Sequence, residues 1–593
     1  MNRPMNILGL TSESHDTGLA VLQHGIPHLI LEEERLNRTK HTLAFPARSL
    51  AAAFGEGGVA FADIDVITTP WDVVTLRRSL FGAVFGHLPG SLSLVWPAAQ
   101  PTQDGNIIAL NFLLRRGLKR QFPGRRIPPI VNVGHHNCHA AVFFVSPFED
   151  ATVVVMDGYG DDAATSVYTG AGNRLQRQWH GRFFDSLGMV YTLVTMHLGY
   201  AAFEEGTVMA LAACGEERFV SQMRDIVRLQ DNGRFAINMD YFSHDTFGML
   251  RPFKRKFIDA FGPPRRRNDP LTQHHRDVAY ALQKVAEEVI LHVVRAAAKQ
   301  HPSRNLVISG GVALNCVANG RLLSESGFER LWVPPCASDT GAPLGSALWH
   351  YHQTLGQPRR TTLDHAYFGL GYDDTAIQAA LDAAGMRYER VTETDLLGRV
   401  AGDLAANKTV GWFQGRYEIG PRALGNRSIL ASPMTAGIRD ILNARVKFRE
   451  PFRPFAPSVL EEHAADWFDM DGPDPFMTIA RKVHAGKRSQ IPAAVHVDGT
   501  ARVQTVSATA NPRYHALIKA FMARTGVPIL LNTSFNKQEP IVTTPTEAIS
   551  CFLRTDLEVL VMGDFYCVDR PKAAADQARR QFGVIEVNTR GGE

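Results

Sequence analysis

Two segments in the N-terminal half of the chain share one order of apolar and polar residues. In the first, an apolar strand at residues 7–11 precedes a polar turn that carries His15 and Asp16, and a hairpin follows. In the second, an apolar strand at residues 152–156 precedes an acidic, glycine-containing turn that begins at Asp157, and again a hairpin follows. Short apolar runs bounded by such turns are typical of buried strands. The pattern therefore predicts a repeated unit of a buried strand and a hairpin.

Helices alternate with strands further along the same half. Apolar residues recur at helical spacing without a breaker over residues 277–300, and a strand then enters a glycine-rich turn and another helix. This alternation predicts an α/β fold. Combined with the repeated unit, it favours a duplicated ribonuclease-H-like domain of the actin-like ATPase and sugar-kinase architecture. Two unrelated hairpins are the alternative, because few residues are identical between the two segments.

The length of the chain indicates more than one domain. A chain of 593 residues exceeds what a single hydrophobic core usually supports. Proline and charged residues replace the helical pattern at residues 357–362, which is typical of a linker. We therefore expect one domain over residues 1–357 and a second α/β domain over residues 363–593.

Composition narrows the class of protein. The net charge of +4 is too small for this length to indicate nucleic acid or an anionic membrane as a partner. Six cysteines without a Cys-x-x-Cys pair fit neither a disulfide framework nor a zinc ribbon, and a reducing compartment is the simplest interpretation. The N-terminus lacks the long apolar core of a secretory signal, and the most apolar segment, residues 81–99, is interrupted by one histidine and two prolines. We expect a cytoplasmic protein.

Four residues could hold a metal ion. His135 and His139 are four positions apart, so a helix would place both imidazoles on one face. With 22 histidines in the chain, such a spacing can arise by chance. Asp157 and Asp339 each follow a predicted strand, and either one alone is better explained as a cap. Together the four form a set of imidazoles and carboxylates that suits iron, manganese or zinc better than calcium.

The glycine-rich turn could contact a nucleotide. Gly310, Gly311 and Asn315 lie where a strand passes through a turn into a helix, as in a phosphate or adenosine cradle. Close packing of the helix on the strand is the alternative explanation.

The C-terminal half contains the densest group of cations, on three short motifs. Their polar residues are Arg422 and Arg427 on a glycine-punctuated turn, Lys447, Arg449 and Arg453 in a run rich in phenylalanine and proline, and Ser534 and Asn536 at a strand end. Cations set among rings and prolines favour a site for a multiply anionic ligand over a solvated surface. Binding of single-stranded RNA is the alternative, and the near-neutral charge of the whole chain places it second.

Together these motifs strongly resemble the O-carbamoyltransferase family of antibiotic, nodulation-factor and toxin biosynthesis, which includes the NodU type and the tobramycin and cephamycin carbamoyltransferases. The resemblance runs from about residue 6 to about residue 569. It is most specific at residues 411–416, 420–428, 449–458 and 531–536.

The resemblance implies an enzyme that works in two steps. The C-terminal domain is similar to the YrdC type, with Lys447 and Arg449 as its Lys-x-Arg pair and Ser534 and Asn536 as its Ser-x-Asn pair. By this similarity it would use carbamoyl phosphate and ATP with magnesium to form carbamoyl-adenylate and pyrophosphate.

The N-terminal domain is similar to the Kae1 type. The resemblance implies that the four residues of the predicted metal site hold iron, as Fe(II), and that the carbamoyl group passes to a hydroxyl of a small-molecule acceptor. His15 and Lys40 match positions that line the transfer site in the family, and a neutral His15 could act as general base. A homodimer is one option for the assembly.

Two competing functions follow from the same domain types. One is a tRNA-modifying enzyme of threonylcarbamoyl-adenosine synthesis, which the near-neutral charge and the motif at residues 420–428 disfavour. The other is a non-catalytic nucleotide-binding protein of the actin fold. Several turns of the N-terminal half depart from the usual family motifs, including residues 14–18 and 206–215, so the acceptor cannot be named from the sequence.

Overall fold

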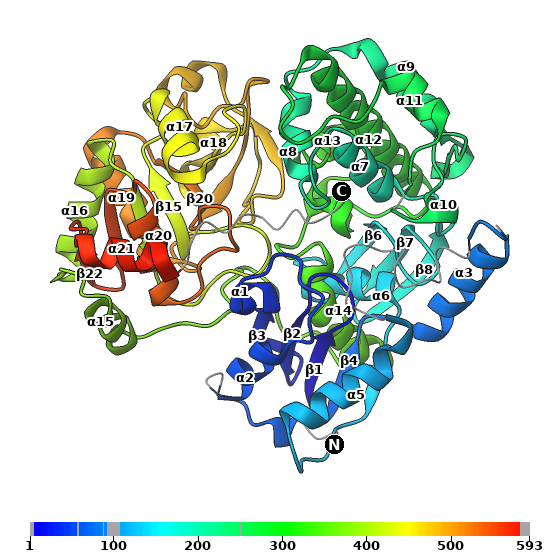
Figure 1. Ribbon diagram of the computed structural model, residues 1–593, viewed down its shortest axis with the longest axis horizontal. Coiled ribbons are helices and arrows are strands. Elements are labelled where there is room, and N and C mark those ends of the chain that lie inside the picture. Colours follow the sequence, from blue (N-terminus) through cyan, green and yellow to red (C-terminus); the bar gives the residue numbers. More distant parts are fainter. Residues whose placement is uncertain (1–4, 56–57, 87, 92–106, 250, 582–593) are drawn as a thin grey trace. The chain divides into compact units, whose positions relative to one another are not determined.

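The computed structural model describes residues 5–55, 58–86, 88–91, 107–249 and 251–581 (Figure 1). By its internal contacts the chain divides into two units. The first comprises Met1–Glu33 and His41–Leu363, and the second comprises Glu34–Lys40 and Asp364–Glu593. The division at residue 363 lies at the end of the expected linker, whereas the grouping of the short segment Glu34–Lys40 with the second unit was not expected.

The first unit contains two five-stranded sheets with the same topology (Figure 1). One has the order β3-β2-β1-β4-β5 and the other the order β8-β7-β6-β11-β12. In each sheet the first three strands of the chain are antiparallel and the last two run parallel to the first. The strands are β1 (Asn6–Thr11), β2 (Gly18–Gln23), β3 (Ile26–Glu32), β4 (Val66–Thr69), β5 (Ile130–Asn132), β6 (Asp150–Met156), β7 (Thr165–Ala171), β8 (Arg174–His180), β11 (Asn305–Ser309) and β12 (Arg330–Trp332). This repeated topology confirms the duplicated ribonuclease-H-like fold.

Helices of the first unit connect and cover these sheets. The long helix α12 (Gln273–Gln300) contacts α7, α8, α9 and α13 (Figure 1). Its apolar periodicity was correctly predicted, and a capping box at Thr272 starts it four residues before the predicted segment. The others are α2 (Ala47–Gly55), α3 (Val73–Gly86), α5 (Leu110–Gln121), α6 (His135–Ala140), α7 (Leu187–His197), α8 (Glu205–Ala212), α9 (Val220–Ile226), α10 (His244–Phe247), α11 (Arg255–Phe261), α13 (Cys316–Glu325) and α14 (Ala342–Leu348). The short helix α1 (Glu33–Asn37) belongs to the second unit from Glu34 onward. A two-stranded sheet pairs β9 (Val227–Leu229) with β10 (Phe235–Ile237).

Close packing of α14 fixes the position of α6. A Cβ at Gly345 would overlap the carbonyl of Cys138 on α6, and a Cβ at Gly9 of β1 would overlap the carbonyl of Pro343. Glycine at both positions therefore lets the backbones of α6, α14 and β1 approach one another. This approach holds the histidine-bearing helix against the first sheet.

The second unit is an α/β domain built on a mixed eight-stranded sheet of order β13-β22-β21-β14-β15-β20-β16-β19. Its core includes Trp412, Phe535 and Tyr514, all fully buried. The strands are β13 (Glu389–Arg390), β14 (Val410–Phe413), β15 (Arg427–Ala431), β16 (Ala456–Leu460), β19 (Gln504–Val506), β20 (Ile529–Ser534), β21 (Val559–Met562) and β22 (Phe565–Cys567), with β17 (Ala480–Lys482) and β18 (Thr500–Arg502) in a separate pair. The helices are α15 (Asp374–Ala383), α16 (Glu393–Ala405), α17 (Gly437–Ile441), α18 (Ala464–Trp467), α19 (Pro512–Thr525), α20 (Pro545–Arg554) and α21 (Lys572–Gln581).

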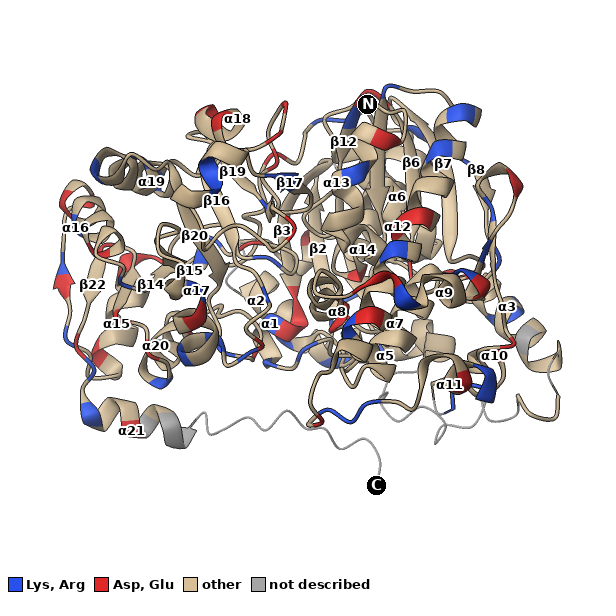
Figure 2. Ribbon diagram, turned by 90° about the horizontal axis from the view of Figure 1, so that it is seen from above, with Lys and Arg blue, Asp and Glu red and all other residues tan. Residues whose placement is uncertain are grey.

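The distribution of charged and apolar residues in the structure agrees with the near-neutral net charge of the sequence and with its interrupted apolar segment. Acidic and basic residues are interspersed along both units (Figure 2). Within the described ranges, no helix is both long and apolar enough to cross a membrane. Of the apolar segment at residues 81–99, the first six residues belong to α3, whereas residues 87 and 92–99 lie outside the described part.

Candidate functional site

The four residues of the predicted metal site come together in the first unit. His135 and His139 lie on α6, Asp157 follows β6, and Asp339 opens the 3₁₀ turn Asp339–Gly341 after β12. All four are buried, and their ligand atoms lie within 4.8 Å of one another. The sequence spacing and the two strand ends therefore converge on one point, as expected.

The distances between the donor atoms fit a single ion. His135 Nε2 lies 3.2 Å from His139 Nε2, 3.2 Å from Asp157 Oδ2 and 3.3 Å from Asp339 Oδ1. His139 Nε2 lies 3.2 Å from Asp339 Oδ1 and 3.6 Å from Asp157 Oδ2. Four nitrogen and oxygen donors about 2.1 Å from one tetrahedral ion would be roughly 3.4 Å apart. The group can hold a metal ion, although the spacing does not distinguish one first-row metal from another.

Neighbouring groups orient these ligands. His135 Nδ1 lies 3.1 Å from the carbonyl of Pro70, which places its proton on Nδ1 and leaves Nε2 for a cation. The ring of Trp71 stacks on that of His135 at 4.1 Å. The second oxygen of Asp157 accepts the backbone N–H of Gly311 at 2.7 Å. Such contacts fix the ring and carboxylate orientations that a metal site requires.

The charges in this cluster are strongly coupled. Burial by itself would lower the pKa of His135, but Asp339 and Asp157 raise it well above its usual value. Burial would likewise raise the pKa of Asp157, but His135 and His139 hold it well below the usual range. Two buried carboxylates thus need positive charge beside them, which protons on the imidazoles or a divalent cation can supply.

His15 lies beside this cluster. Its Nε2 is 3.5 Å from Asp339 Oδ2, and its Nδ1 is 3.0 Å from Asp16 Oδ2. Burial opposes the charged form, but Asp339 and Asp16 raise the pKa of His15 to about 9. A general base must be neutral, so His15 could take that role at neutral pH only if a cation offset the charge of Asp339.

Asp16, which contacts Nδ1 of His15, makes a second contact that the sequence did not predict. Asp16 bridges two imidazoles, because its other oxygen lies 2.7 Å from His41 Nδ1. Phe203 stacks on His41 at 4.1 Å, and its ring centroid lies 5.0 Å from that of His15. Residues 15 and 41 are far apart in the sequence and belong to no common motif, so no local pattern links them.

Lys40 was expected to line the transfer site with His15. Its contacts group it with the second unit, at the end of the segment Glu34–Lys40. There its charge is among those that lower the pKa of Lys447. Its role in carbamoyl transfer stays a prediction.

The glycine-rich turn contacts the candidate metal site at Asp157. Gly310 has a φ of 91°, and a Cβ there would overlap the carbonyl of Met156. The N–H of Gly311 donates to Asp157, and the side chain of Asn315 caps α13 by accepting the N–H of Ala318 at 3.1 Å. These contacts favour the alternative of close packing, and a nucleotide contact by the three residues stays a prediction.

In the second unit, Lys447 contacts Ser534 and Asn536, which the resemblance assigned to the same ligand site. Its buried Nζ donates to Ser534 O and Oγ, at 2.7 and 3.0 Å, and to Asn536 O and Oδ1, at 3.0 and 2.6 Å. Burial lowers the pKa of Lys447 well below its usual value, and the charge of Arg449 acts in the same direction. A lysine ammonium has three N–H groups and these four acceptors engage all of them, so an anionic ligand would have to replace some of these contacts.

Of the arginines expected at this site, Arg449 most resembles Lys447, because burial also lowers its pKa. Its Nε donates to Asn443 Oδ1 at 2.8 Å, and its guanidinium lies 4.5 Å from the ring of Phe455. Burial, with Arg453 as the next cause, lowers the pKa of Arg449 to about 9. Arg422 and Arg453 are both half-buried. The cations interleaved with rings are thus partly removed from water, as the sequence indicated.

The contacts of Arg427 differ from the phosphate contact expected of it, which stays a prediction. It is fully buried, and its guanidinium stacks on Phe413 at 3.6 Å. Its N–H groups donate to five backbone carbonyls, those of Leu370, Gln414, Gly415, Asn426 and Thr543. A guanidinium has five N–H groups, so none is left for a phosphate in this arrangement. The contacts favour a residue that holds loops together.

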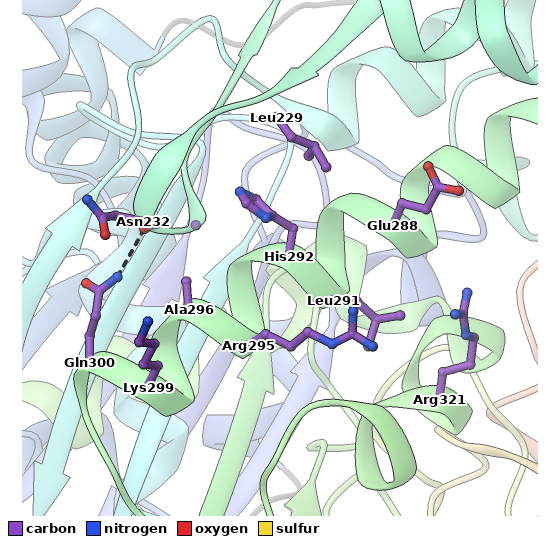
Figure 3. A pocket seen from close by; sticks show the side chains of 11 residues that line it. Leu229, Asn232, Glu288, Leu291, His292, Arg295, Ala296, Lys299, Gln300 and Arg321 are labelled. Atoms are coloured by element: carbon purple, nitrogen blue, oxygen red, sulfur yellow. Dashed lines mark hydrogen bonds between the residues drawn. The ribbon is translucent and has the colours of Figure 1, made fainter.

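One hollow in the first unit lies away from the histidine cluster. It has a volume of about 620 Å³ and is lined by α12 residues, by Arg321 of α13 and by the turn at Asn232 (Figure 3). Its arginines are paired, Arg295 with Glu325 and Arg321 with Glu287 and Glu325. None of the predicted site residues lines it, and we assign it no ligand.

The fold and the clusters define an α/β protein with a duplicated actin-like domain, a buried site that can hold a metal, and a second domain with a buried cationic site. The family models of the carbamoyltransferase N-terminus and C-terminus match residues 6–348 and 401–569. The chain belongs to the carbamoyltransferase family.

Curated relatives cover most or part of the chain. An uncharacterized protein of Synechocystis sp. is 37% identical over 98% of this chain and 100% of its own length. The nodulation protein NolNO of Sinorhizobium fredii is 38% identical over 95% of this chain and 80% of its own. The 3'-hydroxymethylcephem-O-carbamoyltransferase of Amycolatopsis lactamdurans is 42% identical over 39% of this chain and 42% of its own. The chain is thus a homologue of an O-carbamoyltransferase.

Proposed function

We propose that this chain is an ATP-dependent O-carbamoyltransferase that activates carbamoyl phosphate in its second unit and transfers the carbamoyl group in its first. Carbamoyl phosphate, water and ATP would give phosphate, pyrophosphate and carbamoyl-adenylate. The carbamoyl group would then pass to an acceptor hydroxyl, with release of AMP. The observation that carries the proposal is the cluster of Lys447, Ser534 and Asn536, because a buried amine of lowered pKa gains most from an anionic ligand.

In the activation step the cations would offset phosphate charge. Arg449 would contact the oxygens of carbamoyl phosphate or of the ATP phosphates, and Lys447 would do so by exchanging some of its present acceptors for phosphate oxygens. Magnesium would accompany ATP. Ser534 and Asn536 hold the Lys447 ammonium by hydrogen bonds to their side chains. Arg422 and Arg453, which are half-buried, are further candidates for phosphate contacts.

In the transfer step, His135, His139, Asp157 and Asp339 would hold a divalent ion. When bound, the ion would polarise the carbamoyl carbonyl as a Lewis acid. His15 lies beside Asp339 and would accept the proton of the acceptor hydroxyl through Nε2. Asp16 contacts His15 Nδ1 and would hold the ring in that orientation. We propose Fe(II) from the resemblance, since the ligand set alone also suits zinc or manganese.

The acceptor class follows from the relatives alone. One is named for a hydroxymethylcephem and others for nodulation, so we propose a hydroxyl of a secondary metabolite of the antibiotic, toxin or nodulation-factor kind. The proposed compartment is the cytoplasm, where carbamoyl phosphate and ATP are available.

Exchange of labelled pyrophosphate into ATP tests the activation step. We expect exchange that depends on carbamoyl phosphate and is lost in Lys447→Ala. Exchange that needed threonine and bicarbonate instead would indicate the tRNA-modifying activity. If exchange occurred under neither condition, the result would support the alternative of a non-catalytic nucleotide-binding protein.

A further inference from the structure

The segment Glu34–Lys40 belongs to the second unit although the chain on both sides of it belongs to the first. We infer that Arg35 and Arg38 of this segment are positioning residues for the carbamoyl phosphate and ATP site of the second unit. The inference rests on the proposed function. It concerns residues that no motif of the second unit contains.

Arg35 fixes one loop of that site. Its side chain is buried, and its Nη2 donates to the carbonyls of Gly420 and Glu418, at 2.7 and 3.3 Å. Its guanidinium also lies 5.5 Å from the ring of Tyr417. These contacts hold the start of the turn at residues 418–428, which carries Arg422.

The buried carboxylate of Glu418 shapes the rest of this turn. Glu418 Oε1 accepts the N–H groups of Leu424, Asn426 and Arg427, at 2.8, 2.6 and 3.2 Å. The backbone of Glu418 therefore has to stay in place if the turn is to keep its form. Arg35, from the segment Glu34–Lys40, holds this backbone through its hydrogen bond to the carbonyl of Glu418.

Arg38 fixes a second loop. It donates to the carbonyls of Pro540 and Ile541 and forms an ion pair with Glu547 at 3.2 Å. This loop, residues 536–543, begins at Asn536, whose side chain donates to the carbonyl of Glu539 and accepts from Lys447. Lys447 thus holds one end of the loop and Arg38 holds the other.

The backbone at Arg38 indicates that this contact is not incidental. Its φ of 66° lies in the left-handed region, which non-glycine residues adopt at a cost. Residues held in such conformations persist where the surrounding contacts determine them, and they cluster at functional sites. The turn at Arg38 directs the guanidinium toward the loop while the chain returns to the first unit.

Thr543 joins the two loops into one network. Its hydroxyl donates to the carbonyl of Arg35 at 3.2 Å, and its own carbonyl accepts from Arg427 Nε at 3.3 Å. Loss of either Arg35 or Arg38 would therefore loosen the turn at residues 418–428 and the loop at residues 536–543. The turn carries Arg422, a candidate for phosphate contacts, and the loop carries Asn536, which holds Lys447. Small misplacement of such groups costs catalysis heavily.

The full-length chain with Arg38→Ala tests the inference in the pyrophosphate exchange assay. We expect kcat/KM for carbamoyl phosphate to fall about 10- to 100-fold, with the far-UV spectrum retained. Added guanidinium ion should restore part of the activity, and Arg38→Lys should lie between, because an ammonium cannot reach both carbonyls as a guanidinium does. If Arg38 had only a structural role, its loss would lower the melting temperature and the folded fraction. The KM of the molecules that remain folded would then be unchanged.

Arg359→Ala is the matched control. Arg359 also anchors loops through its guanidinium, which donates to the carbonyls of Phe144, Ser146 and Phe148, and all of these residues belong to the first unit. We expect it to change thermal stability and leave the exchange constants as they are. If Arg38→Ala does not fold, Arg38→Lys decides.

The outcomes separate the inference from the proposed function. Unaltered exchange constants in folded Arg38→Ala or Arg38→Lys, with exchange present in the parent chain, would overturn the inference only. Absence of exchange in the parent chain would overturn the proposed function and the inference with it. A fall in Arg359→Ala equal to that in Arg38→Ala would also overturn the inference.

Discussion

His135 Nε2 lies 3.2 Å from His139 Nε2 inside a buried group that also contains two carboxylate oxygens. The four-residue spacing of His135 and His139, which could have arisen by chance, therefore does bring the two imidazoles together in the structure. Two imidazole nitrogens that both point at the same carboxylates are arranged as ligands of one cation rather than as partners of each other. The predictions for the first unit follow from this arrangement.

Replacement of a metal ligand should separate the two proposed steps. We expect His135→Ala to lose the bound metal and carbamoyl transfer while it keeps the exchange of pyrophosphate into ATP, because the activation residues lie in the other unit. Metal content measured by elemental analysis, alongside both activities, checks this. His136→Ala is the control, since His136 contacts Ser166 at 2.8 Å and is not part of the donor group. Equal loss of exchange in His135→Ala would contradict the division of labour.

Removal of metal should destabilise the first unit. A ligand at 100 times its Kd contributes about 2.7 kcal/mol to the stability of the state that binds it. We therefore expect a chelator to lower the melting temperature of the parent chain, and readdition of the ion to restore it. The same treatment should leave the melting temperature of Asp339→Asn nearly unchanged. A chelator that had no effect on the parent chain would argue against a resident metal.

The pH dependence of carbamoyl phosphate binding should follow Lys447. Its pKa is lowered in the free protein, and a bound phosphate would raise it, so binding takes up a proton once pH exceeds the pKa of the free state. Affinity should be constant below that pKa and weaken above it, by up to about tenfold per pH unit. Lys447→Arg, if it binds, should lack this dependence. Calorimetry in buffers of different ionisation enthalpy measures the proton uptake, and proton release would contradict the assignment.

Arg427 should matter for folding before it matters for chemistry. Its removal takes this donor from five carbonyls, four of them on buried residues, so we expect Arg427→Met to lower the free energy of unfolding by about 3 kcal/mol. Urea denaturation checks this. Arg422→Met should change stability much less, because Arg422 is half-buried. A fully stable Arg427→Met that lacked exchange would instead support the phosphate-binding role first expected.

Helices, strands and turns that depend on a local residue pattern could be predicted from the sequence. The strand–hairpin repeat predicted the three antiparallel strands of each sheet. The ends of β6 and β12 bring Asp157 and Asp339 together because these strands run parallel in one sheet, so their carboxyl ends lie at the same edge. The sequence could not show that Arg427 is buried, since a cation among aromatic residues has the same pattern whether it meets phosphate or carbonyls. Nor could it show that Glu34–Lys40 packs into the second unit, or that His41 meets Asp16. Those contacts join distant residues and leave no periodicity in the chain.

The central claim is that the second unit activates carbamoyl phosphate with ATP. The most direct measurement is the incorporation of labelled pyrophosphate into ATP by the purified full-length chain, with and without carbamoyl phosphate. We predict incorporation only when carbamoyl phosphate is present, loss of it in Lys447→Ala, and retention of it in His135→Ala. Incorporation that is independent of carbamoyl phosphate, or that persists at the parent rate in Lys447→Ala, would contradict the account.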